Sequence, residues 1–245
     1  MRRLVPVLVA LAALAVAASA QAAKLPRIDG AVVVVDPGHN LTNWKHPDEI
    51  NRLVDAGTLR KACDTTGTST ASGYSEAAHN LDVAYRVKRL LEGVGATVIL
   101  THTRTDPPWG PCITERAAIG NRANADVAIS IHADGHEGGG RGFHVIYPTS
   151  VVGLTDDIAR ESYRFALRLR ATFAHTTGMP FSTYTGRAAL NGRSDLGGLN
   201  LSDVPKVFIE CGNMRDRTDA ALLSSVRFRK LEALGIARGI ARYLQ

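Results

Sequence analysis

The feature that most constrains the fold is a regular alternation of two kinds of segment between residues 28 and 245. Short apolar runs rich in β-branched residues predict strands at 31–35, 96–100, 127–131, 143–147 and 204–209. Amphipathic segments with apolar residues at helical spacing predict helices at 75–93, 113–123, 156–175 and 226–244. Strands that alternate with helices favour an α/β architecture, so we expect a mainly parallel twisted sheet flanked by helices.

Composition fits this expectation and excludes several other classes of protein. Of the 245 residues, 45% are hydrophobic and 21% are charged, which is too apolar for a disordered chain. No internal repeat or proline-rich linker interrupts the sequence, so we predict one domain at 28–245. The net charge of +6 permits anionic partners, but the excess is modest and only 6% of residues are aromatic, so nucleic acid is not an expected partner.

Residues 1–22 have the pattern of a secretory signal peptide. Arg2 and Arg3 precede an apolar run at 4–18, and small residues suited to a signal peptidase follow at 18–22. The apolar run is shorter than the roughly 20 residues of a membrane span, although an uncleaved anchor is the alternative. We therefore expect a protein secreted to the periplasm or cell wall, with no stable membrane insertion after cleavage.

An oxidising compartment favours pairing among the three cysteines. Cys63 and Cys112 lie in polar segments that contain Gly, Pro or Thr, as loop-to-loop disulfides do, whereas Cys211 ends an apolar strand. We predict a disulfide between Cys63 and Cys112 and a free, buried Cys211. A zinc site with cysteine ligands is the competing interpretation, but no C-x-x-C spacing supports it.

Polar residues stand at the carboxyl ends of three predicted strands, where open α/β sheets bind their ligands. His39 follows the first strand, His132 follows the strand at 127–131, and Glu210 follows the strand at 204–209. The helix at 75–93 adds Glu76 and Asn80 in its first turn, on the stripe that faces the sheet. A carboxylate that points inward is costly unless it is paired or bound to a cation, so Glu76 needs a partner.

Two histidines and one carboxylate that converge, with a fourth position open to water, are the ligand set of a catalytic zinc site. We therefore interpret His39, Glu76 and His132 as candidate ligands of one zinc ion. Glu210 is the candidate acid/base, because apolar surroundings raise the pKa of a carboxyl group. The structural alternative is a set of unrelated residues: hydrogen-bonded histidines, a Glu76 that interacts with the helix dipole, and a Glu210 paired with Arg116 or Lys206.

The segments that carry these four residues follow one another along the chain in an order that resembles the signature of the zinc-dependent N-acetylmuramoyl-L-alanine amidases. These enzymes are the amidase-3 class of bacterial cell-wall hydrolases. The resemblance covers about residues 31–244 and rests on the segments 35–39, 75–80, 130–133 and 204–210. The stretch from Gly192 to Asn200 and the cysteine pair are most similar to short secreted mycobacterial members. In one departure, Cys211-Gly212 follows Glu210 where many members have Gly-Phe.

The resemblance implies a peptidoglycan hydrolase that cleaves the amide between N-acetylmuramic acid and L-alanine of the stem peptide by zinc-activated water. It implies that His39, Glu76 and His132 hold the zinc and that Glu210 is the catalytic residue. Peptidoglycan and muropeptide fragments are the expected partners, and we expect a monomer. Three further residues are predicted substrate contacts: Asn80, Arg116 and Asn200.

Two other classes remain as alternatives. The first is a zinc peptidase that cuts within the stem peptide, and the second is a non-catalytic wall-binding regulator that has kept the fold. Loss of a ligand or of the base would mark the second class, and the sequence retains all four residues.

The segment at 40–74 interrupts the alternation. It is polar, it ends in a run of Thr, Ser, Gly and Ala at 65–73, and it is longer than the roughly 15 residues beyond which a loop is usually functional or disordered. Because it connects His39 to Glu76, it leaves the predicted zinc site and returns to it. We expect a long loop that forms a lid over the substrate groove; a purely structural loop is the alternative.

Overall fold

A six-stranded sheet organises the computed structural model, which describes residues 25–245. The predicted signal peptide at 1–22 lies outside the described residues. Across the sheet the strands are β4 (Thr97–Leu100), β1 (Val32–Pro37), β5 (Val127–Asp134), β8 (Lys206–Asn213), β6 (His144–Pro148) and β7 (Leu190–Arg193). Within this six-stranded sheet, only the pairing of β6 with β8 is antiparallel. The predicted α/β class with a mainly parallel sheet is therefore confirmed.

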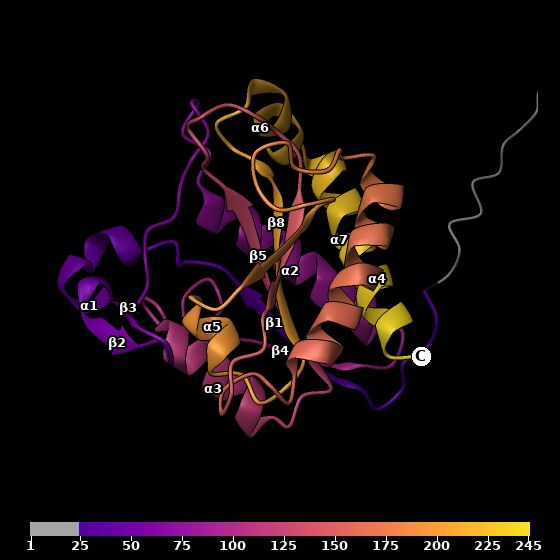
Figure 1. Ribbon diagram of the computed structural model, residues 1–245. Coiled ribbons are helices and arrows are strands. Elements are labelled where there is room, and N and C mark those ends of the chain that lie inside the picture. Colours follow the sequence, from indigo (N-terminus) through magenta and orange to yellow (C-terminus); the bar gives the residue numbers. More distant parts are fainter. Residues whose placement is uncertain (1–24) are drawn as a thin grey trace, which may run out of the picture.

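Helices cover both faces of the sheet (Figure 1). On one face α2 (Glu76–Glu92) and α4 (Ala159–Thr177) pack against the strands, and α7 (Val226–Tyr243) lies between these two helices. On the other face lie α3 (Ile113–Arg122) and the short α5 (Gly197–Asn200), while α6 (Arg217–Leu223) follows β8. None of the helices between residues 25 and 245 has both the length and the apolar character that a membrane crossing requires.

The alternation of side chains along β8 separates the core from the face that carries the site. Val207, Ile209 and Cys211 are fully buried in the main core beside the residues of α4 and α7. Phe208 and Glu210 point to the opposite face, toward α3 and α5. The packing of these three side chains in the core thus fixes the position of β8 and, with it, the position of Glu210.

All five predicted strands and all four predicted helices are present. Their ends differ in one consequential way: β5 continues to Asp134 and β8 continues to Asn213. His132 and Glu210 therefore lie within strands rather than after them, because the pairing of β5 with β8 extends past the apolar runs, and they are register partners in that pairing. The sequence did not predict β7, whose four residues have no apolar periodicity.

The segment at 40–74 is not a plain loop. It contains a 3-10 turn η1 (Asn43–Lys45), the helix α1 (Pro47–Asn51) and an antiparallel hairpin of β2 (Leu53–Asp55) and β3 (Arg60–Ala62). The predicted disulfide between Cys63 and Cys112 is present and joins the end of this hairpin to the start of α3. Cys211 is free and buried, as predicted. Short polar elements of this kind escape periodicity because they bury few apolar side chains.

Candidate metal centre

The side chains of His39, Glu76 and His132 converge at the carboxyl edge of the sheet. Their ligand atoms all lie within 4.8 Å of one another. Glu76 Oε1 is 3.1 Å from His39 Nε2 and 2.9 Å from His132 Nδ1. Glu76 reaches this point because it is the first residue of α2, and the Ser75 side chain caps that helix by accepting from the Ala78 N–H. Two imidazoles and a carboxylate at this spacing suit one zinc ion.

A glycine makes this convergence sterically feasible. Gly38 lies directly beneath the His132 ring, and a Cβ at Gly38 would come within 2.1 Å of that ring. His39 then adopts a left-handed backbone conformation, with φ of 62°. The close approach of the ends of β1 and β5 therefore explains why only glycine fits at position 38, directly after β1.

Backbone atoms of the 40–74 segment hold two of the three candidate ligands. His39 Nδ1 is 3.0 Å from the Thr65 carbonyl oxygen, and the Thr68 N–H donates to Glu76 Oε2 at 2.9 Å. A carbonyl oxygen can only accept, so Nδ1 of His39 carries the hydrogen and Nε2 presents its lone pair. Gly67 passes so close that a Cβ there would lie 2.7 Å from the His39 ring.

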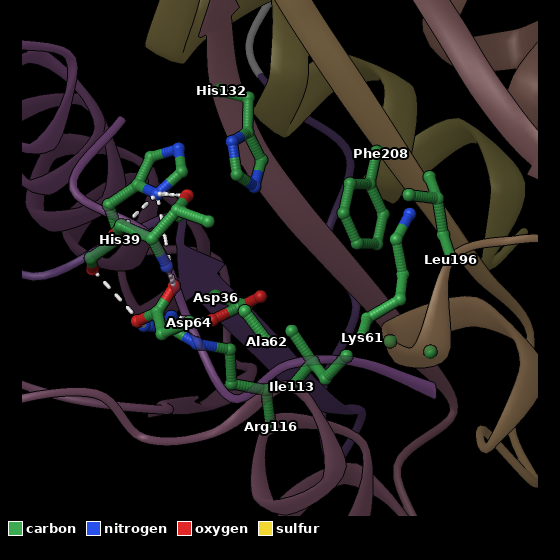
Figure 2. Close-up of a pocket in the computed structure, with 14 residues that line it drawn as sticks. Asp36, His39, Lys61, Ala62, Asp64, Ile113, Arg116, His132, Leu196 and Phe208 are labelled. Carbon is green, nitrogen blue, oxygen red and sulfur yellow. Dashed lines mark hydrogen bonds and ion pairs between the residues drawn. The ribbon is translucent and has the colours of Figure 1, made fainter. Parts of the chain in front are cut away.

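Glu210 lines the same cavity as the three candidate ligands. The cavity measures about 310 Å³, and Asp134 and Arg193 also line it. A neighbouring hollow continues past the His132 ring, which stacks on Phe208 with ring centroids 5.3 Å apart (Figure 2). The four residues singled out in the sequence are thus assembled around one space.

The pKa values of Glu210 and Glu76 are shifted in opposite directions. Burial raises the pKa of Glu210 well above its ordinary value, and the negative charges of Glu76 and Asp134 raise it further. Burial alone would also raise the pKa of Glu76, but the two neighbouring imidazoles hold it well below its ordinary value. Glu76 is therefore suited to bind a cation as a carboxylate, while Glu210 is suited to exchange a proton.

Glu210 has no competing structural partner among the described residues. Its Oε2 atom is buried without a hydrogen bond, and it forms no ion pair with Arg116 or Lys206. The structural alternative for Glu210 is therefore wrong. An unpartnered buried carboxyl oxygen is costly to the fold, which is typical of a group kept for chemistry.

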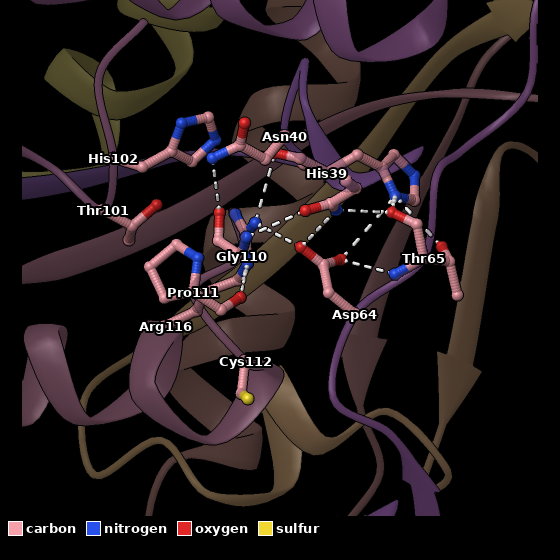
Figure 3. Close-up of polar contacts among 12 residues, drawn as sticks. His39, Asn40, Asp64, Thr65, Thr101, His102, Gly110, Pro111, Cys112 and Arg116 are labelled. Carbon is pink, nitrogen blue, oxygen red and sulfur yellow. Dashed lines mark hydrogen bonds and ion pairs between the residues drawn. The ribbon is translucent and has the colours of Figure 1, made fainter. Parts of the chain in front are cut away.

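Arg116 instead holds the floor of the site together (Figure 3). Its guanidinium donates to Asp36 Oδ1 at 2.6 Å and to Asp64 Oδ2 at 2.8 Å. Its remaining N–H groups donate to the backbone carbonyls of Pro37, His39 and Pro111. Burial alone would raise the pKa of Asp36, but the charge of Arg116 holds it well below its ordinary value. The network ties the end of β1, His39 and Asp64 to α3.

The three predicted substrate contacts are all buried and bonded within the chain. All five N–H groups of Arg116 are engaged by the contacts above. Asn80 Nδ2 donates to the Gly38 carbonyl at 3.1 Å, and Asn200 Nδ2 donates to the Ala56 carbonyl at 2.8 Å. These contacts give each side chain a role in the fold, and a direct contact with substrate stays a prediction.

The sequence did not predict the residues of other segments that contact the candidate ligands and hold them in place. Thr65, Gly67 and Thr68 contact His39 or Glu76, and Asp64 anchors Arg116. Their one signal was the position of the Thr-rich run immediately before Glu76. Arg193 was missed because it stands on the unpredicted strand β7, although it lines the cavity with Glu210.

Replacement of Arg116 by methionine is expected to lower the free energy of unfolding by about 3–5 kcal/mol, because it leaves Asp36 and Asp64 buried without their cation. Arg122→Met on the same helix is the matched control, since Arg122 pairs with Glu115 in solvent, and we expect it to be silent. Urea denaturation of both variants measures the difference. Equal stability of the two would contradict the role given to Arg116.

The fold and the site together define a class: an α/β protein with a candidate hydrolytic metal centre at the carboxyl edge of its parallel strands. A family model for N-acetylmuramoyl-L-alanine amidase matches residues 33–242. The chain therefore belongs to the N-acetylmuramoyl-L-alanine amidase family.

Individual relatives agree with this assignment. The chain is 39% identical over 227 residues to the N-acetylmuramoyl-L-alanine amidase Rv3717 of Mycobacterium tuberculosis. The matched region covers 92% of this chain and 91% of the relative. It is similar to the crystal structure of the amidase Ami1 from Mycobacterium smegmatis, with 39% identity, a TM-score of 0.83, and coverage of 89% of this chain and 98% of that one. For the apo form of Ami1 from Mycobacterium abscessus the identity is 39%, the TM-score is 0.81, and the coverage is 89% and 100%.

Proposed function

We propose that this chain is a zinc-dependent hydrolase of the amide that joins N-acetylmuramic acid to L-alanine in peptidoglycan and its muropeptide fragments. One observation carries the proposal: the unpartnered carboxyl group of Glu210 shares a cavity with the side chains of His39, Glu76 and His132. The family assignment supplies the class of bond, and the donor set supports zinc.

In this mechanism His39, Glu76 and His132 would hold the ion. Zinc bound there would supply a Lewis acid that polarises water and the scissile carbonyl. Glu210 takes the proton from the attacking water and returns it to the departing amine of L-alanine. Burial raises the pKa of the Glu210 carboxyl group, which makes its carboxylate a stronger base for the first transfer, and the protonated group is then the acid for the second. The Thr65 carbonyl keeps the His39 ring oriented throughout.

Product identification tests the bond that is cleaved. Zinc-loaded protein is incubated with purified peptidoglycan and with a soluble muramoyl peptide, and the released fragments are analysed by mass spectrometry. We expect intact stem peptides with a free L-alanine amino group, and none from the Glu210→Gln protein. Fragments cut within the stem peptide would instead identify a zinc peptidase, and binding without release would identify a wall-binding regulator.

We further propose that the chain acts outside the cytoplasm, as a secreted monomer whose leader at 1–22 is removed. The support is the leader's sequence pattern and the cell-wall class of the family. N-terminal sequencing of the exported protein should find the first residue close to position 23. An exported protein that still begins with the leader would show that the segment is retained.

The 40–74 segment is proposed to wall the substrate groove as a lid, tied down by Cys63–Cys112. The support is that its residues touch His39 and Glu76 and that Lys61 on β3 reaches the Asp195 carbonyl at 2.9 Å. We expect the Cys63→Ser/Cys112→Ser variant to lose about 2–4 kcal/mol of stability and to show a raised KM. Chemical denaturation and steady-state kinetics measure both. Unchanged stability and an unchanged KM would contradict the proposal that this segment is a lid tied down by the disulfide.

A further inference from the structure

The positive charge of the chain is concentrated on two helices. Four arginines and one glutamate give α4 a net charge of +3, and five cationic residues and one glutamate give α7 a net charge of +4. These two helices therefore carry +7, whereas the whole chain carries only +6. The basicity noted in the sequence is thus a property of one layer of the molecule.

Helical spacing places these cations on the outward side of that layer. On α4, Arg160, Arg164 and Arg168 recur every fourth residue and all three are exposed. On α7, the cationic residues that lie off its buried stripe are Arg227, Lys230, Arg238 and Arg242. We call these seven residues the basic helix face. The two remaining cations do not belong to the face: Arg170 of α4 lies over the Phe181 ring and donates to the Ala188 carbonyl at 3.1 Å, and Arg229 of α7 is buried and pairs with Asp82 at 2.6 Å.

Close packing joins the two rows of cations into one surface. A Cβ added at Gly239 would lie 2.8 Å from the Leu169 Cα, and one added at Gly235 would lie 3.1 Å from the Phe173 Cα. The helices therefore run antiparallel with their backbones nearly in contact, side by side in Figure 1. Arg238 reaches across the seam and donates to Thr176 Oγ1 at 3.1 Å.

Few carboxylates balance this surface. Glu161 pairs with Arg164 and Glu232 is buried against His79, while the exposed Asp156 and Asp157 precede α4 near Arg160 without forming an ion pair with it. Among the ion pairs of residues 25–245, none involves Arg160, Arg168, Arg227, Lys230, Arg238 or Arg242. Like charges held together with few counter-charges repel one another, and an external polyanion relieves this repulsion.

The chemistry of the face favours phosphate groups on a linear polymer. Six of the seven cations are arginines, whose planar guanidinium groups bind phosphate oxygens in pairs. Residues four apart on a helix are separated by about 6 Å along its axis, which gives a regular row of charge. The large exposed apolar side chains on these helices are only Tyr163 and Val226, too few for insertion into a membrane.

We propose that the basic helix face binds a phosphate-bearing linear polymer of the cell envelope and thereby retains the chain near the wall. The face lies on the layer that covers the Val207 and Ile209 side of the sheet, whereas the cavity with Glu210 opens on the other side. Polymer binding and access to the candidate metal centre are therefore compatible. The proposal goes beyond the proposed hydrolysis and does not depend on it.

The test measures binding of the intact chain to long-chain inorganic polyphosphate, with polyglutamate of equal charge and phosphatidylglycerol vesicles as comparisons. The triple variant Arg160→Gln/Arg164→Gln/Arg168→Gln should bind polyphosphate on the order of 100-fold more weakly, roughly fivefold for each arginine. The control Arg104→Gln/Arg122→Gln/Arg217→Gln removes the same charge from exposed positions elsewhere and should change affinity less than about threefold. Binding by the unmodified chain should weaken steeply with added salt.

Three results would overturn the proposal: equal losses in the two triple variants, polyglutamate binding as tight as polyphosphate binding, or vesicle binding tighter than either. Hydrolysis of a soluble muramoyl peptide is measured on the same proteins and should be unchanged by the α4 substitutions. If the unmodified chain hydrolyses nothing, the proposed function fails while the polyphosphate result stands on its own.

Discussion

Replacement of Glu210 by alanine is expected to reduce kcat by roughly 10²- to 10⁴-fold while zinc remains bound. Glu210 lines the cavity but is not one of the three groups spaced to hold the ion, so its removal takes away the proton acceptor and leaves the ligands in place. Kinetics on a soluble muramoyl peptide, together with zinc analysis of the same preparation, measure the two effects separately.

Glu210→Gln sharpens this prediction because it preserves the size of the side chain. The carboxyl group is buried with an unpartnered oxygen, so its loss should leave the free energy of unfolding unchanged or raised. Glu92→Ala, at the exposed end of α2, is the control and should leave turnover intact. Near-normal turnover in either Glu210 variant would show that another group takes the proton.

Replacement of His132 by alanine should abolish both zinc binding and turnover. Loss of an outer partner of a metal ligand typically costs 10- to 100-fold in affinity, so loss of a ligand should cost more than about 100-fold. Titration with zinc after chelation measures the affinity, and circular dichroism checks that the fold is retained. His175→Ala, on the exposed side of α4, should bind zinc normally.

Normal zinc binding by the His132→Ala variant would contradict the proposed ligand set. If His132→Ala bound one zinc with unchanged affinity, the ion would have other ligands, and the convergence of His39, Glu76 and His132 would be a hydrogen-bonded cluster only. The stacking of His132 on Phe208 would then be its main role.

The parts of the site that the sequence predicted are those with a local signature. His39, His132 and Glu210 each follow an apolar run, and parallel strands bring the carboxyl ends of such runs to one edge. Glu76 was found because its place on the helical stripe requires it to face the sheet. These inferences need only side-chain period and strand direction, which short segments encode.

The remaining parts depend on contacts between distant segments. Arg116 bonds Asp36 and Asp64 across 80 and 52 residues, and no spacing in the sequence pairs a particular arginine with a particular aspartate. Hydrophobic periodicity likewise does not show whether a strand pairs parallel or antiparallel with its neighbour, so it could not predict the antiparallel pairing of β6 with β8. The hairpin at β2 and β3 is secured by a disulfide rather than by an apolar face, so it carried no periodic signal.

In the proposed site one zinc ion is held by His39, Glu76 and His132 beside Glu210. The most direct measurement is anomalous X-ray scattering at the zinc absorption edge from crystals of the zinc-loaded chain. We expect one strong peak bounded by those three side chains, within the cavity that Glu210 lines. A strong peak at any other group of side chains, with none at this one, would contradict it.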